Sequence, residues 1–257
     1  MSSEALIGGL TVVEMVLLAL LALNLWRTGL FRTYHALFYY SLIELCRTAA
    51  TVGISPYTKL YGYIYFLTQP VIWILYALMT LEMYQTALSS FPSIASTSRR
   101  VISWWLVGAL VLAVASLALG TSTDASWPIL ETFLVVGRVI NTSLFLFVIG
   151  LAATLFWFPV PLRRNALVNA SAFTFFFAAC TGAMLGRNII GPEFRSLAST
   201  ALLTASIATI VVWRLFLTPE GEENRIYSGF HRDKETAERL IGQLETLNRT
   251  LAGTIQK

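Results

Sequence analysis

Ionisable and amide side chains lie inside stretches of this sequence that are otherwise apolar. A charge near the middle of a bilayer costs several kcal/mol, so it normally faces a partner, a cavity or a ligand. Carboxylates and guanidinium groups together suit ion pairing, proton transfer, or recognition of a carboxylate or phosphate. The side chains predicted to share one depth are Glu14, Glu44, Arg47, Gln69 and Arg138.

Three hypotheses for this polar set stay open. Glu44 and Arg47 are three residues apart on one helix face, so they can pair locally within a structural network of ion pairs. With Arg187 included, three arginines accompany two acids, and this positive excess would suit a small anionic ligand. Ion or proton translocation is the third hypothesis. The candidate site residues are Glu14, Glu44, Arg47, Gln69, Trp73, Arg138, Asn141 and Arg187.

The elements that must position these residues follow from composition. Apolar residues form 56% of the chain and charged residues 12%, whereas soluble domains carry about 25% charged residues. Runs of ~20 apolar residues are typical of membrane-spanning helices. The sequence therefore predicts an all-α, seven-transmembrane-helix bundle in contact with the lipid bilayer. The predicted spans are Leu6–Trp26, Phe31–Ile54, Tyr61–Leu88, Val101–Leu119, Ile129–Phe158, Asn165–Ile190 and Ser196–Leu217.

The loops predict the orientation of the bundle. Arginine pairs occupy alternate loops, at 27 and 32, 99 and 100, and 163 and 164, while the opposite loops hold few bases. Basic loops stay in the cytoplasm. We therefore expect an N-terminus outside the plasma membrane and a C-terminus in the cytoplasm.

The chain divides into a membrane domain, 1–217, a linker, 218–232, and a tail, 233–257. Apolar residues in the tail recur every three or four positions, which predicts an amphipathic helix that needs a partner surface. Self-association, contact with its own bundle or membrane complex, and a separate protein stay open as partners. The predicted partner-binding residues are Leu240, Leu244, Leu247 and Leu251.

Several function classes have no support in the sequence. No predicted span contains a lysine, which excludes a retinal Schiff base. His35 is the only histidine in 1–217, so a haem held by two histidines and a histidine-rich metal site are excluded. Common catalytic and nucleotide-binding motifs are absent. We therefore expect no catalytic residue, no cofactor, no metal and no binding of nucleic acid.

A second polar group lies near the predicted inner ends of the spans. Long polar side chains there can reach water, so we expect them to be anchors at the membrane interface. The group comprises Glu82, Tyr84, Asn165, Asn169 and Arg214.

Three segments and the tail carry a resemblance. The runs 32–40, 67–73 and 157–165, together with the tail from His231, resemble uncharacterised bacterial seven-helix integral membrane proteins. The resemblance implies the same helix count. Such proteins bring no assigned activity, so no functional residue is carried over.

These patterns favour a non-enzymatic membrane protein with a ligand-binding, sensory or assembly role. In this hypothesis the polar set lies in the outer half of the bundle, and the tail helix contacts a second copy or a partner. A small-solute transporter that uses the same polar set is the first alternative. A structural subunit of a larger membrane complex is the second.

Overall fold

The fold was analysed in a computed structural model that describes most of the first 87 residues and most of 161–227. The helices α1, α2 and α3 come first, with a 3-10 turn, η1, between α1 and α2. The later helices are α6, α7 and the short α8, and two short strands, β1 and β2, flank them. The described ranges are 3–54, 58–87, 107, 136–137, 139–150, 161–190, 194–223, 225–227, 242–243 and 246. The element bounds are α1 Ser3–Arg27, η1 Leu30–Arg32, α2 His35–Thr51, α3 Lys59–Ala87, β1 Pro161–Arg163, α6 Arg164–Ile190, α7 Arg195–Phe216, α8 Glu220–Glu223 and β2 Arg225–Tyr227.

The prediction of a helical membrane protein is confirmed. Four helices of the described part are long and apolar enough to cross a bilayer, at Ile7–Arg27, Lys59–Thr86, Arg164–Ala183 and Leu197–Phe216. Their outward faces carry large apolar side chains, such as Leu67 at 75% exposure. An apolar surface of this extent suits contact with lipid.

The helix ends agree with the sequence prediction except at the start of α2. The second span was predicted from residue 31, but α2 begins at His35. Gly29, at φ 73°, ends the first helical stretch in a left-handed conformation that favours glycine, and η1 follows it. Most of the predicted fourth and fifth spans lies outside the described residues. In these two spans the structure places only Val107, residues 136–137 and the helical stretch Val139–Gly150.

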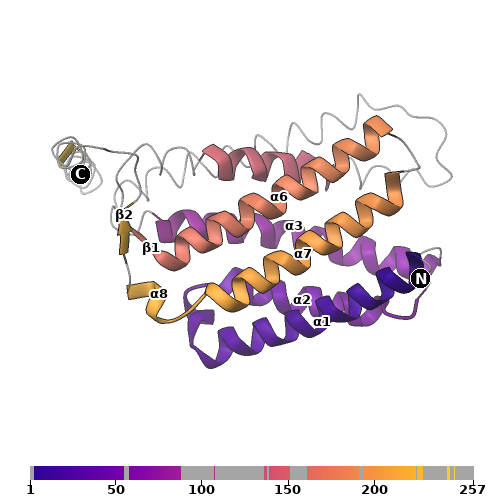
Figure 1. Ribbon diagram of the computed structural model, residues 1–257, viewed down its shortest axis with the longest axis horizontal. Helices are drawn as coiled ribbons and strands as arrows, with labels where there is room; N and C mark the ends of the chain where they lie inside the picture. Colours follow the sequence, from indigo (N-terminus) through magenta and orange to yellow (C-terminus); the bar gives the residue numbers. More distant parts are fainter. Residues whose placement is uncertain are drawn as a thin grey trace.

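The long helices lie side by side (Figure 1). α1 packs against α2 and α7, α2 packs against α3, and α6 packs against α7, with a smaller contact between α3 and α6. Each helix therefore touches two others, and the helices enclose a common core. At one end of the bundle, called the α8 end below, α8 lies beside β1 and β2 (Figure 1).

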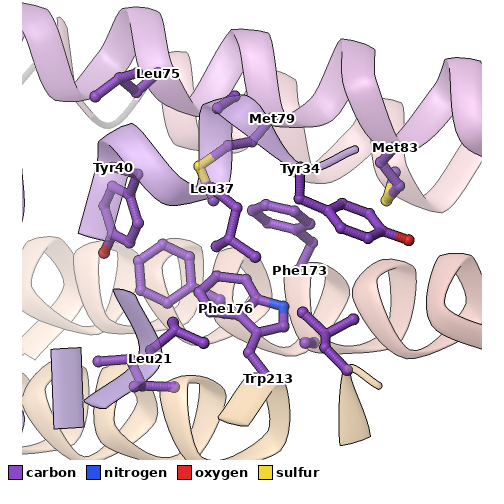
Figure 2. Packing of buried hydrophobic residues seen from close by; sticks show 14 of the residues in the cluster. Leu21, Tyr34, Leu37, Tyr40, Leu75, Met79, Met83, Phe173, Phe176 and Trp213 are labelled. Atoms are coloured by element: carbon purple, nitrogen blue, oxygen red, sulfur yellow. The ribbon is translucent and has the colours of Figure 1, made fainter. Parts of the chain in front are cut away.

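The core is rich in aromatic side chains from α2, α6 and α7 (Figure 2), and α3 adds Tyr84. Phe173 meets Trp213 with ring centroids 5.2 Å apart, and Tyr40 lies 5.4 Å from Tyr76. Offset and edge-on aromatic pairs of this kind add about 0.5–1.5 kcal/mol beyond area burial. They fix the spacing of the helices that carry the polar residues.

Two findings at the α8 end differ from the sequence analysis. β1 and β2 form an antiparallel pair, with Leu162 opposite Ile226, inside and beside segments predicted to be loop and linker. The expectation that the inner polar group reaches water is wrong for its two asparagines and for Tyr84, which is 4% exposed. Asn165 is 0% exposed and Asn169 is 2% exposed, and the Trp213 Nε1–H donates to Asn169 Oδ1 at 3.0 Å.

Candidate functional site

Arg47 lies at the centre of the polar residues in the middle of the bundle. Its Nη2 group donates to Glu44 Oε1 on the same helix, at the i, i+3 spacing that brings side chains together. Its Nη1 group donates to Gln69 Oε1 of α3 at 2.8 Å. The guanidinium also lies over the Tyr65 ring, 5.9 Å from its centroid. Arg47 therefore ties α2 to α3 through charge-assisted bonds.

Glu14 makes the equivalent connection between α1 and α7. The Ser206 hydroxyl of α7 donates to Glu14 Oε1 at 2.5 Å. The Glu14 carboxylate also lies within electrostatic range of Glu44 and Arg47. We call Glu14, Glu44, Arg47, Gln69 and Ser206 the Arg47 cluster. Four helices contribute to it, and its two carboxylates are 7% and 5% exposed.

The charges in the Arg47 cluster do not balance within the described residues. Two carboxylates accompany one guanidinium, and Glu44 Oε2 is buried without a hydrogen-bond partner in the part of the chain that the structure describes. A buried acceptor without a donor is unfavourable. The described atoms of the cluster therefore offer a hydrogen-bond acceptor. The excess of positive charge that was predicted for the site would require Arg138 and Arg187.

The other predicted site residues are placed less completely. Trp73 packs against Gly137, because a Cβ there would meet Trp73 Cζ2 at 3.1 Å, and this contact joins α3 to the segment before Val139–Gly150. Asn141 is 6% exposed, and its Oδ1 has no hydrogen-bond partner among the described residues. Arg187 belongs to α6, but its side chain is outside the described set. Arg138, Leu240, Leu244, Leu247 and Leu251 also lie outside the described residues.

A second cluster, partly buried and at the α8 end, was missed by the sequence analysis. Glu222 Oε1 accepts hydrogen bonds from the Tyr34 hydroxyl at 2.6 Å and from Asn165 Nδ2 at 2.8 Å. Glu222 Oε2 accepts from Arg163 Nη1 at 2.9 Å. We call Tyr34, Arg163, Asn165 and Glu222 the Glu222 cluster. Both oxygens of its carboxylate have donors.

Asn165 also holds the chain that leaves α7. Its Nδ2 group donates to the Thr218 carbonyl at 2.7 Å, and its Oδ1 accepts from the Thr218 N–H at 3.3 Å. Gly221 approaches so closely that an added Cβ would lie 2.0 Å from Asn165 Oδ1. Only glycine fits at this position without displacing Asn165.

Tyr34 is fully buried, and its hydroxyl faces the Glu222 carboxylate. Burial raises the pKa of Tyr34 far above its usual value, and the hydrogen bond to Glu222 raises it further. The hydroxyl therefore keeps its proton and stays a donor over the whole physiological pH range.

Glu82 of α3 provides the N-terminal cap of α2. Its carboxylate oxygens accept from the His35 N–H at 2.7 Å and from the Ala36 N–H at 3.1 Å. Tyr34, at the N-cap position of α2, makes no side-chain capping bond. A carboxylate at the positive end of a helix replaces the missing cap.

A charge pattern in the sequence points to the Glu222 cluster. The acids at 220, 222 and 223 follow α7, and the basic pair Arg163 and Arg164 precedes α6. Both segments were predicted on the same side of the membrane, so their opposite charges could meet. Because 218–232 was interpreted as a linker, its acidic residues were not considered as partners of the arginine pair.

Within the described residues, no three His, Cys, Asp or Glu side chains are grouped in a way that could hold a metal ion. The chemistry that the two clusters offer is charge-assisted hydrogen bonding between helices. Comparisons with protein-family models, with curated proteins and with solved structures found no match for this chain.

Proposed function

We propose that this protein is a non-enzymatic, multi-pass protein of the plasma membrane with an assembly or sensory role. In this proposal seven helices cross the membrane, the N-terminus is outside, and the helix over 233–257 binds a second copy or a partner in the cytoplasm. The alternating arginine pairs support this orientation, because they place the α8 end on the cytoplasmic side.

One observation carries the assembly role: each member of the Arg47 cluster bonds to another member of it. Arg47 joins Glu44 and Gln69, and Glu14 receives the Ser206 hydroxyl. Buried polar networks whose members are paired fix one arrangement of helices. A bundle with one fixed arrangement of helices would hold the start of the tail in one orientation toward its partner. Recognition of an anionic ligand would instead need arginine side chains beyond those already paired.

The test is the oligomeric state of the full chain in detergent, measured by native mass spectrometry. Replacing Leu240, Leu244, Leu247 and Leu251 together by serine removes the apolar stripe of the tail. We expect a self-associated wild type and a monomeric variant. Gln243→Ala is the matched control, because Gln243 is exposed. An unchanged oligomer in the leucine variant, or a monomeric wild type that co-purifies with no partner, contradicts the proposal.

The open acceptor Glu44 Oε2 favours a transporter as the second candidate. A buried carboxylate oxygen without a donor among the described residues is a place where a proton or a cationic group could bind in passing. In this case the purified protein in liposomes should carry a solute or protons. Glu44→Gln should then abolish the flux per folded molecule, with the folded fraction taken from the unfolding curve because this variant also breaks the pair with Arg47. Absence of flux for the wild type across cationic and anionic solutes removes this candidate.

A further inference from the structure

At the Glu222 carboxylate, three separate parts of the bundle converge on the segment that leads from α7 toward the tail. Tyr34 precedes α2, Arg163 ends β1, and Asn165 lies in the first turn of α6. All three donate to the two oxygens of one side chain on α8. Loss of the negative charge on this side chain therefore weakens all three bonds together.

The α8 helix has little stability of its own. It spans four residues, Glu220–Glu223, which is far shorter than a helix that forms in isolation. Its position depends on contacts with α6 and β1, and on the close approach of Gly221 to Asn165. Directly after α8, β2 pairs with β1, so Arg225 lies opposite Arg163. The holding contacts thus cover 220–227.

The ion pair is also accessible from water. The Arg163 side chain is 35% exposed and the Glu222 side chain is 16% exposed. An exposed edge allows protons and competing ions to reach the pair, whereas the Tyr34 and Asn165 side of the carboxylate is buried. A contact with these properties can open without unfolding of the bundle.

We propose that the Glu222 cluster is a latch that holds the root of the tail on the bundle and, when it opens, frees the helix over 233–257. The opening of the latch is a local step, separate from unfolding of the long helices. Its effect on association rests on the function proposed above, in which the tail binds a second copy or a partner. The latch itself, as a releasable contact, does not depend on that function.

Cleavage by trypsin after Arg225 measures the opening. Trypsin needs a free backbone, and Arg225 is paired in β2, so the rate follows the population of the open state. Hydrogen bonds to a charged group change such a population by roughly tenfold or more. We expect Glu222→Gln and Gly221→Ala to speed this cleavage of the full-length protein by at least ~10-fold. The fragment ending at Arg225 is quantified by mass spectrometry.

Two matched controls isolate the latch. Glu223→Gln removes the same charge from an exposed neighbour, and Gly182→Ala adds the same methyl group to α6 where nothing lies within 4 Å. Both should cleave at the wild-type rate. The thermal unfolding midpoint of each variant shows whether the bundle survives. Since Glu222→Gln adds no bulk, it tests the latch even where Gly221→Ala disrupts folding.

The results separate the latch from the proposed function. Equal cleavage rates for Glu222→Gln and Glu223→Gln overturn the latch. Suppose that the latch variants are cleaved faster, but that the oligomeric state changes neither in these variants nor on deletion of 233–257. This result supports the latch and contradicts the proposed function. Suppose instead that deletion of 233–257 changes the oligomeric state, but that the latch variants, although cleaved faster, do not change it. This result overturns the idea that the latch controls association.

Discussion

The Arg47 cluster and the Glu222 cluster solve the problem of buried charge in different ways. The Arg47 cluster lies among the long apolar helices, and one of its carboxylate oxygens has no donor within the described residues. The Glu222 cluster lies where the chain turns at the α8 end, and both oxygens of its carboxylate are bonded. The first cluster keeps an unused acceptor, and the second is complete.

The two clusters also differ in which side chain makes their long-range bonds. Arg47 binds Glu44, three residues away, and Gln69, 22 residues away on the next long helix. Glu222 binds Tyr34 across 188 residues and Arg163 across 59. Arg47 therefore joins α2 to its neighbour in sequence, while the Arg47 cluster makes its long-range connection through Glu14 and Ser206, 192 residues apart. In the Glu222 cluster one carboxylate makes the long-range bonds itself.

The largest expected effect tests whether the Arg47 cluster is the stronger of the two. Arg47→Ala leaves the buried Glu44 carboxylate without its cation, and breaking a buried pair in this way costs about 3–5 kcal/mol. The free energy of unfolding in mixed detergent measures the loss. Arg27→Ala, at an exposed arginine, is the control. Adding Glu44→Gln should recover part of the loss, and no recovery would mean that the unpaired charge is not the cause.

Asn165→Ala is expected to have the next largest effect, at the α8 end. Asn165 is fully buried and bonds to the Thr218 backbone and to Glu222, so its removal leaves buried groups unsatisfied. Each such group costs about 1–3 kcal/mol, and we expect a total of about 2–3 kcal/mol. The same unfolding assay applies, with the exposed Gln85→Ala as control. A loss equal to that of Gln85→Ala would show that the Glu222 cluster contributes nothing to stability.

Tyr34→Phe should lower the free energy of unfolding by about 1.5 kcal/mol, because it removes one donor from a carboxylate. The raised pKa of Tyr34 sets the pH dependence: the unfolded tyrosine loses its proton near pH 10, whereas the folded one keeps it. The wild-type advantage is therefore constant below about pH 10 and shrinks above it. Parallel unfolding curves for the two proteins from pH 7 to 11 measure this. An advantage that stays constant at pH 11 contradicts the assigned environment, in which Glu222, Arg163 and Glu82 are the nearest charges.

Arg163→Ala is expected to have the smallest effect. The pair with Glu222 is partly exposed, and such pairs contribute about 0.2–1 kcal/mol. Salt should screen it, so the difference from wild type should vanish at high ionic strength, whereas that of Arg47→Ala should persist. Arg164→Ala is the neighbouring control. An equal salt response in the Arg47 and Arg163 variants would remove the distinction between a buried and an accessible cluster.

The sequence predicted the bounds of the long helices that the structure describes well, because the length of an apolar run fixes where a membrane helix fits. It also placed Glu44, Arg47 and Gln69 at one depth, since one helix and the helix after it carry them. The partner of Glu14 could not be found this way. Ser206 is a small residue in an apolar run, and nothing in its spacing distinguishes it from a serine at a helix contact.

The Glu222 cluster could be recognised only from the three-dimensional structure. Asn165 and Asn169 lie near span ends, where polar residues usually reach water, and only the packing of α6 against α7 buries them. Whether Glu222 is a loop acid or a buried partner depends on the turn after Phe216 and on the glycine beside it. These are long-range contacts, and periodicity along the sequence carries no information about them.

The cap that Glu82 provides for α2 has a consequence for how the protein enters the membrane. α2 is short for a span, carries an ion pair, and takes from α3 both the cap of its first turn and the amide that satisfies Arg47. α2 is therefore stable in the bilayer only when α3 lies beside it. We therefore expect α2 and α3 to insert together as a helical hairpin during synthesis. Glu82→Ala should then lower the fraction of chains in which α2 becomes inserted, as scored by glycosylation mapping of nascent chains, while α1 inserts as before.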